Sequence, residues 1–292
     1  MKIGVVFPQI EFPSDPAAIR DYTQAVEGMG FSHILAYDHV LGANPDRPGG
    51  WKGPYTYQNP FQEVFTLFAF MAGITTRLEF ATGIVILPQR QTALVAKQAA
   101  QIDVFTGGDR FRLGVGNGWN EVEYISLGQD FHNRGRRMEE QVELLRLLWK
   151  QPLVKFEGKY HTVPDAGILP RPVNGNIPIW FGGSDDRVLD RMARLGDGWM
   201  VNQRAPEDVK TAWEKASEAL QRHGRSWGSD FGLEPRITGS LIKPDDWPKL
   251  VEEWRGLNAT YLSFNTMGAG YTSVQQHLDT LRQFAEIVGV KA

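Results

Sequence analysis

The chain alternates short runs of apolar, often β-branched residues with longer windows in which apolar residues recur every three or four positions. The first run, 3–7, precedes Ser14-Asp15-Pro16, which supplies a helix N-cap and a proline near the first helical position. Apolar residues then recur at helical spacing as far as Gly30, a residue type typical of helix ends. This unit therefore predicts one strand followed by one helix.

The same unit repeats along the rest of the chain. Further strands are predicted at 33–38, 78–87, 110–115, 177–181, 198–201, about 237–242 and 259–264. The helices that follow them are predicted at 61–75, around 95–102, at 134–150, around 188–195, and at 206–222, 247–257 and 274–288. Eight such repeats predict an α/β fold, a single (β/α)8 TIM barrel, rather than a doubly wound open sheet.

Two segments interrupt this alternation and are predicted to be insertions. The first, about 41–60, follows the second strand and is rich in glycine, proline and aromatic residues. The second, about 151–176, precedes the fifth strand and carries four prolines. Loops of this length inside a compact domain are usually functional or mobile. We expect both near one rim of the barrel, and we expect residues 1–292 to form one domain because no linker or internal repeat is present.

Composition and charge narrow the class of protein. The 31 basic and 34 acidic side chains give a net charge of -3, which creates no field for nucleic acid or an anionic membrane. The most apolar stretch, 64–74, is about half as long as a membrane-spanning helix, and the N-terminus lacks the long apolar region of a signal peptide. We therefore expect a cytoplasmic protein that acts on a small molecule.

The chain has no cysteine, which excludes disulfides, thiolate metal sites and a cysteine nucleophile. Its six histidines show neither H-x-H nor H-E-x-x-H spacing, so no metal site is expected. A barrel hydrolase would need paired carboxylates at strand ends. Glu121 and Glu123 follow the fourth strand, but we interpret them as a solvated helix face.

Active sites of such barrels lie at the carboxyl ends of the strands. Asp38-His39 ends the second strand, and histidine exchanges a proton near neutral pH. The alternative is a structural pair in which Asp38 caps the loop. Gly182-Gly183-Ser184 ends the fifth strand directly before a helix, where free N–H groups bind phosphate, or where Ser184 simply caps the helix.

The fourth strand ends in Gly114-x-Gly116-x-Gly118, which lacks the spacing of a dinucleotide fingerprint. Such glycines allow a flat ligand to lie against the main chain, with Asn117 and a neighbouring tryptophan as walls; close packing of loops explains them equally well. Farther along, Arg134, Arg136 and Arg137 begin a helix, where the helix dipole disfavours cations. We expect them to pair with Glu139 and Glu140.

Taken in order, these strand ends resemble the luciferase-like monooxygenase superfamily, specifically its F420-dependent oxidoreductase branch, over essentially the whole chain. The segments that carry the resemblance are 4–9, 38–39, 83–90, 97–98, 112–120, 132–137, 178–184 and 193–199. Each is short, and their order and spacing together make the resemblance specific.

The resemblance implies a barrel mouth that holds a flavin-type ring, with its phosphate at Gly182-Gly183-Ser184. It implies a non-prolyl cis peptide near Gly83-Ile84-Val85, and it places Asp38 and His39 beside the ring, with His39 as the proton donor or acceptor. The cofactor-contacting residues expected from it also include Asn117 and Gly118. A homodimer is a further expectation from the family.

The leading functional hypothesis is an F420-dependent oxidoreductase that moves a hydride between deazaflavin and a small organic substrate. The alternative is an FMN-dependent monooxygenase that receives reduced flavin from a separate reductase; a non-catalytic flavin-binding protein also stays open. Some F420-dependent relatives carry a glutamate after strand four, where this chain has 117–120 without one, so His39 is expected to act alone or with substrate. Cations that suit the acidic tail of F420 are Arg90, Lys97, Arg171, Arg187 and Arg204.

Overall fold

A computed structural model describes residues 1–201, 206–228 and 230–291 of the protein. Ten parallel strands form the central sheet: β1 (Lys2–Val6), β2 (His33–Ala36), β3 (Glu79–Thr82), β4 (Val85–Ile86), β5 (Phe111–Gly116), β8 (Ile179–Gly182), β9 (Gly198–Met200), β10 (Gly232–Glu234), β11 (Arg236–Thr238) and β12 (Tyr261–Asn265). Their order is β10-β9-β8-β5-β3-β2-β1-β12-β11, with β4 beside β5. The strands make a nearly closed barrel, as predicted.

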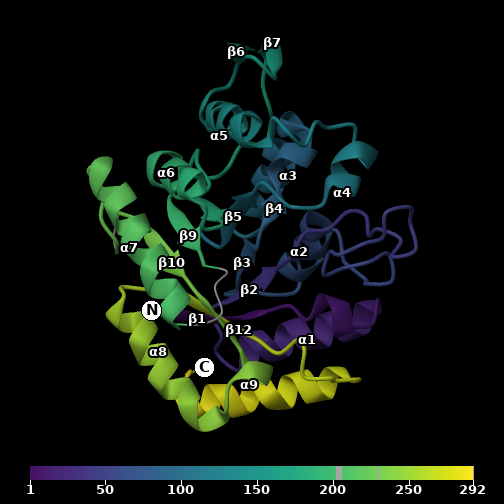
Figure 1. Cartoon of the computed structure of the whole chain (residues 1–292), viewed down its shortest axis with the longest axis vertical. Coiled ribbons are helices and arrows are strands. Elements are labelled where there is room, and N and C mark those ends of the chain that lie inside the picture. Colours follow the sequence, from purple (N-terminus) through teal and green to yellow (C-terminus); the bar gives the residue numbers. More distant parts are fainter. Residues whose placement is uncertain (202–205, 229, 292) are drawn as a thin grey trace.

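Helices surround this barrel on its outside (Figure 1). They are α1 (Pro16–Gly28), α2 (Val64–Ala72), α3 (Thr92–Phe105), α4 (Glu121–Ser126), α5 (Arg134–Lys150), α6 (Asp186–Leu195), α7 (Pro206–Arg222), α8 (Trp247–Gly256) and α9 (Val274–Val288). The predicted start of the first helix is confirmed: the side chain of Asp15 accepts from the N–H of Ala17, and Pro16 is the first residue of α1. The apolar faces of the helices pack on the strands in one core.

The barrel closes through one strand segment that changes neighbours. β10 pairs with β9, while β11 pairs with β12, and Pro235 lies between them. The Pro235 carbonyl accepts from the N–H of Ser263 at 3.0 Å, so the segment bridges β9 and β12 and completes the eighth position of the barrel. The predicted seventh strand at about 237–242 is therefore wrong in position. Proline inside a run argues against a strand, so Pro235 kept β10 from being recognised in the sequence.

The third predicted strand is divided into β3 and β4. The peptide bond between Gly83 and Ile84 is cis, in agreement with the expectation for this position. Beside it, Gly114 of β5 lies so close to β3 that a Cβ atom there would be 1.9 Å from the carbonyl oxygen of Thr82. Glycine at 114 is therefore required by the approach of two backbones.

The two insertions start at different ends of the barrel. The first, after β2, reaches the carboxyl ends of the strands, where Pro54 and Tyr55 line a cavity. The second contains a hairpin, β6 (Val154–Glu157) and β7 (Thr162–Ala166), which projects beside α5 in Figure 1. Its last part binds the loop before β5, with the side-chain amide of Asn174 donating to the Gly108 carbonyl at 3.1 Å. The expectation of a common rim is wrong, because a segment that follows a barrel helix starts at the amino-terminal end.

The inside of the barrel contains a buried ion pair. Arg112 of β5 donates to the carboxylate of Glu234 on β10 at 2.6 Å. The other carboxylate oxygen contacts the His33 ring on β2 at 2.8 Å and accepts from the Ser263 hydroxyl on β12 at 2.7 Å. The Arg112 guanidinium also lies 3.5 Å from the centre of the Tyr261 ring. These contacts join four strands across the interior.

Replacing Gly114 with alanine is expected to lower the free energy of unfolding by about 3 kcal/mol, because the Thr82 carbonyl belongs to the backbone and has no rotamer to escape into. Gly28→Ala is the matched control: nothing lies within 4 Å of a Cβ there, and alanine in α1 is expected to stabilise by about 0.5 kcal/mol. Urea unfolding measures both. Equal effects of the two substitutions would contradict the close approach of β3 and β5.

Glu234→Gln is expected to lower the free energy of unfolding at pH 7 by about 3 kcal/mol or more, because it leaves the Arg112 charge buried without its partner. Burial alone would raise the pKa of Glu234, but Arg112 and His33 hold it well below its usual value of 4.5. A lowered folded-state pKa stabilises above the unfolded value, and this contribution is lost as the pH falls. Urea unfolding from pH 7 to pH 3 should show the difference between variant and wild type shrinking. The exposed Glu121→Gln should change stability by less than about 0.5 kcal/mol.

Candidate active site

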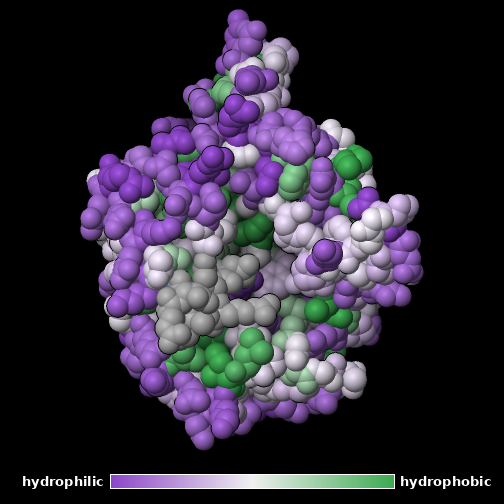
Figure 2. All heavy atoms as spheres, in the orientation of Figure 1, coloured by the Kyte–Doolittle hydropathy of each residue, from purple (hydrophilic) through white to green (hydrophobic). Residues whose placement is uncertain are grey.

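The carboxyl ends of the strands surround a cavity of about 790 Å³, within the usual size of cofactor and substrate pockets. Figure 2 looks at this end of the molecule and shows the hollow at its centre. The residues that line it come from the ends of β2, β4, β5, β8 and β9, from both halves of the split strand, from the segment after β12 and from the first insertion. The cavity lies at the end of the barrel where the site is predicted.

The side chain of Ile84 occupies the part of the cavity wall where three strands end. A Cβ atom on Gly116 would lie 2.6 Å from Ile84, and one on Gly182 would lie 2.9 Å from it. A Cβ on Gly118 would likewise collide with Ile86. These glycines thus make room for the two isoleucines that follow the cis peptide. The sequence predicts that a flat ligand lies directly against the backbone of these glycines. In the structure the side chains of Ile84 and Ile86 lie there instead.

Most of the predicted site residues meet at this cavity. The predicted residues that line it are Asp38, His39, Gly83, Ile84, Asn117, Gly118, Gly182 and Gly183. Val85 does not line the cavity, because its side chain is fully buried in the core. Ser184 is exposed just beyond the lining, and Asp185, rather than Ser184, caps α6 by accepting from the N–H of Arg187 at 3.0 Å.

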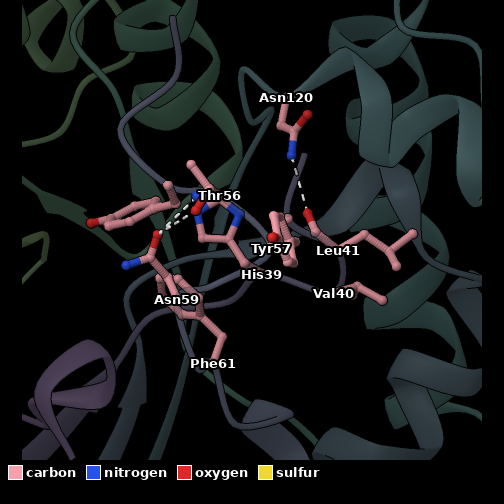
Figure 3. Close-up of a pocket in the computed structure, with 10 residues that line it drawn as sticks. His39, Val40, Leu41, Thr56, Tyr57, Asn59, Phe61 and Asn120 are labelled. Carbon is pink, nitrogen blue, oxygen red and sulfur yellow. Dashed lines mark hydrogen bonds between the residues drawn. The ribbon is translucent and has the colours of Figure 1, made fainter. Parts of the chain in front are cut away.

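His39 lies in an aromatic surrounding. Its ring is 4.8 Å from the centre of Phe61, 5.1 Å from Tyr55 and 5.6 Å from Trp119. His39 and Tyr55 line both the large cavity and a smaller one of about 270 Å³ bounded by the first insertion, which Figure 3 shows in close-up. The His39 side chain is 10 % exposed, so little water reaches it except through these cavities.

Glu123 of α4 contacts His39, which the sequence did not predict. Its Oε2 lies 3.3 Å from Nδ1 of His39, and its Oε1 accepts from the N–H groups of Val40 at 2.6 Å and Leu41 at 3.1 Å. Glu121 is exposed as expected, but the interpretation of Glu123 as part of a solvated face is wrong, because its side chain is completely buried. One available signal was Asn120, the N-cap of α4, which places Glu123 at the third helical position, where carboxylates often turn inward to bind backbone N–H groups.

Asp38 is held by charges on the neighbouring strand end. Arg90 donates to both of its carboxylate oxygens, at 2.6 and 3.3 Å, and the N–H of Ile86 donates at 3.2 Å. Arg90 also pairs with Glu63 at 3.2 Å. Burial opposes its charge, but the two carboxylates outweigh this and raise the pKa of Arg90. Arg90 is therefore engaged in joining two strand ends, and is not a spare cation at the mouth.

Arginine side chains gather between the start of α5 and the second half of α6. The described structure gives Arg134, Arg136 and Arg137 no ion pair with Glu139 or Glu140, so the predicted pairing is wrong. Glu139 instead binds Arg191 and Arg194 of α6, and Glu140 binds the hairpin of the second insertion at 159–161. The start of α5 approaches the middle of α6, since Gly135 of α5 lies against Arg191 and Asn117.

Several polar atoms in this corner have no hydrogen-bond partner among the described residues. They are Nη1 of Arg191, Nε of Arg134 and of Arg137, and Oδ1 of Asn117 and of Asn133. Burial lowers the pKa of Arg137. The Arg137 guanidinium nevertheless keeps its positive charge at neutral pH, as arginine side chains do. An anion at this corner would satisfy the guanidinium N–H groups and the dipole of α5 together.

The remaining predicted cations lie elsewhere. Lys97 donates to the carbonyl of Leu169, and Arg171 donates to the carbonyl of Lys150, both away from the cavity lining. Arg187 is exposed in the first turn of α6. Arg204 lies outside the described residues. On the far wall of the cavity, Arg236 packs over the ring of Tyr37 at 5.2 Å.

A parallel β/α barrel with a ligand-sized cavity and an ionisable histidine at its carboxyl end is the architecture of a barrel enzyme. The chain matches the family described as luciferase-like monooxygenase over residues 1–278, and it belongs to that family. It is an oxidoreductase of the luciferase-like type, as the resemblance implied. None of the described helices is both long and apolar enough to cross a membrane.

Its relatives differ in what their names assign to them. An uncharacterized protein of Mycobacterium tuberculosis is 31% identical, over 94% of this chain and 97% of its own. The 5,10-methylenetetrahydromethanopterin reductase of Archaeoglobus fulgidus is 27% identical, over 77% of this chain and 60% of its own. The pyrimidine monooxygenase RutA of Allorhizobium ampelinum is 29% identical, over 62% of this chain and 51% of its own.

Solved structures share the fold at low identity. The monooxygenase RslO1 of Streptomyces bottropensis superposes with a TM-score of 0.79 at 19% identity, covering 99% of this chain and 98% of its own. An F420-dependent secondary alcohol dehydrogenase, solved with an F420-acetone adduct, gives a TM-score of 0.79 at 17% identity, covering 98% of each chain.

Proposed function

We propose that this protein is an F420-dependent oxidoreductase that transfers a hydride between deazaflavin and a small organic substrate. The observation that carries the proposal is the cavity of about 790 Å³, which combines His39 and the Gly182-Gly183 turn at one barrel mouth. Asn117 of its lining and the Arg191 guanidinium both lie beside Gly135 at the start of α5. Among the relatives, the reductase of Archaeoglobus fulgidus matches more of this chain than the pyrimidine monooxygenase does.

The residues present fit a flat, anionic cofactor. Gly183 has φ +113, a conformation that side chains rarely adopt, and a Cβ there would lie 3.2 Å from Val188 in the cavity wall. The turn before α6 therefore offers its backbone to a phosphate, with Ser184 and Arg187 beside it. Nearby, the unpartnered Nη1 of Arg191 and Oδ1 of Asn117 supply a donor and an acceptor. An acidic cofactor tail is compatible with this corner of the site.

When bound, the deazaflavin would supply the hydride acceptor or donor. We assign proton exchange with the substrate to Nε2 of His39, because Nδ1 is already in contact with Glu123. Tyr55, Phe61 and Trp119 exclude water from the imidazole, which favours proton exchange with substrate over exchange with solvent. Asp38 supports this arrangement by holding the end of β2 to Arg90 and Ile86, while Gly83, Ile84 and Gly118 shape the wall beside the ring.

The second candidate is an FMN-dependent monooxygenase that takes reduced flavin from a separate reductase. It is favoured by the match to the pyrimidine monooxygenase RutA. The same turn and the same arginine corner would bind the FMN phosphate, so the two candidates differ in the cofactor rather than in the phosphate site. A homodimer and a cytoplasmic location remain expectations from the family and the composition.

Fluorescence titration of the purified protein separates the two cofactors. We expect F420 to bind with micromolar affinity and FMN at least tenfold more weakly. Gly183→Ala should weaken F420 binding about tenfold, because alanine disfavours φ +113 and moves the phosphate turn. Gly107→Ala is the matched control: its φ is +80 with open space around the Cβ, and it lies in the loop before β5. Tighter binding of FMN than of F420 would favour the monooxygenase instead.

His39→Ala should leave F420 affinity within about threefold of wild type and lower turnover at least a hundredfold, because it removes the proton carrier and keeps the phosphate turn. Turnover is measured as F420 reduction by a panel of small secondary alcohols. The exposed His132→Ala serves as control and should behave as wild type. Unchanged turnover in His39→Ala would contradict the chemical role of His39, and F420 binding without turnover in the wild type would favour a cofactor-binding protein.

A further inference from the structure

Glu123 lies against the ring nitrogen Nδ1 of His39, at 3.3 Å, and is itself shielded from solvent. We propose that Glu123 is a positioning residue, which holds His39 as the tautomer protonated on Nδ1 and so leaves the Nε2 lone pair to exchange a proton with the substrate. The proposal rests on the function proposed above for the part that concerns catalysis. The tautomer itself depends only on the protein.

The protonation of Nδ1 follows from the chemistry of its partner. The Glu123 carboxylate receives the N–H groups of Val40 and Leu41 on Oε1, and the side-chain amide of Gln89 at 3.4 Å on Oε2. Burial alone would raise the pKa of Glu123, but these backbone donors and His39 outweigh it and lower the pKa below 4.5. An ionised carboxylate only accepts hydrogen bonds. The proton between Glu123 and His39 therefore belongs to Nδ1.

The orientation of this carboxylate is fixed from both ends. On α4, Asn120 caps the helix by accepting from the N–H groups of Val122 and Glu123, which sets the direction of the Glu123 side chain. On the first insertion, the two N–H groups that follow His39 bind Oε1, so Oε2 must face the imidazole. One side chain thus holds both the histidine and the first residues of the insertion.

The other groups around the His39 ring do not compete for this role. Tyr55, Phe61 and Trp119 contact it through their rings. Asp38, the neighbouring carboxylate along the chain, is bound to Arg90 and to the N–H of Ile86. Glu123 is therefore the carboxylate that the described structure brings into hydrogen-bonding contact with the imidazole.

Glu123→Gln is expected to reverse the tautomer without breaking the loop contacts. The N–H groups of Val40 and Leu41 require an acceptor, so they keep the oxygen of the new amide in the place of Oε1. Its NH2 group then faces Nδ1 and donates to it. The ring must take the proton on Nε2 instead, as happens when an amide replaces the carboxylate behind a catalytic histidine.

Nitrogen NMR of the apo-protein with 15N-labelled histidine measures the tautomer, at about pH 9, where histidine rings are neutral. His39→Asn assigns the signal. We expect the wild-type ring to be protonated mainly on Nδ1 and the ring in Glu123→Gln mainly on Nε2. Glu27→Gln is the matched control: Glu27 also gathers backbone N–H groups, those at 76–78, but lies far from His39 in the fold and should leave the tautomer unchanged.

A wild-type ring protonated mainly on Nε2 overturns the proposal, and this spectrum decides it even where Glu123→Gln does not fold. An unchanged tautomer in folded Glu123→Gln also overturns it. In turnover with F420, Glu123→Gln should lower kcat at least tenfold and leave the KM for F420 within twofold; an unchanged kcat overturns the positioning role. Failure of the wild type to bind F420 contradicts the proposed function, while the tautomer measurement stands apart from it.

Discussion

The barrel depends on a charged pair enclosed within it, between Arg112 and Glu234. The closing segment is the least regular of the strands, because Pro235 divides it and each half follows a different neighbour. Glu234 stands directly before that proline and binds side chains from β2, β5 and β12. A buried carboxylate must keep such partners, since its desolvation is otherwise uncompensated. The pair therefore defines where the split segment lies, and with it one wall of the cavity.

A steric constraint shapes the opposite wall. Gly116 and Gly182 leave space for Ile84, so the strands β5 and β8 end at a surface of isoleucine rather than of bare backbone. Above that surface the aromatic rings around His39 limit its contact with water. The cavity thus joins an apolar wall to a titratable ring, which suits chemistry that needs a dry site and one controlled proton.

Charge is distributed unevenly around this mouth. On the side of β2, arginine and carboxylate satisfy each other, as in Arg90 with Asp38 and Glu63. Between the start of α5 and the middle of α6, Nε of Arg134, Nε of Arg137 and Nη1 of Arg191 are buried without acceptors among the described residues, although Glu139 binds Nε of Arg191. Unpaired buried donors are costly unless a ligand meets them. This is the distribution that the proposed phosphate-bearing redox cofactor would use, with its phosphate near the unpartnered donors and its ring near His39.

Local patterns along the sequence determined the barrel, the caps such as Asp15, and the strand ends that carry Asp38-His39 and Gly182-Gly183, because periodicity, capping and turn chemistry act between near neighbours. The same patterns predicted the seventh strand at the wrong position and predicted that Glu123 is exposed to solvent, whereas it is buried. Only the tertiary structure decided that Glu123 faces His39, that Glu139 binds Arg191 rather than Arg136, and that Glu234 meets Arg112. The partner of a charged side chain is chosen by elements far apart in the chain, and their approach is fixed by the packing of the whole barrel.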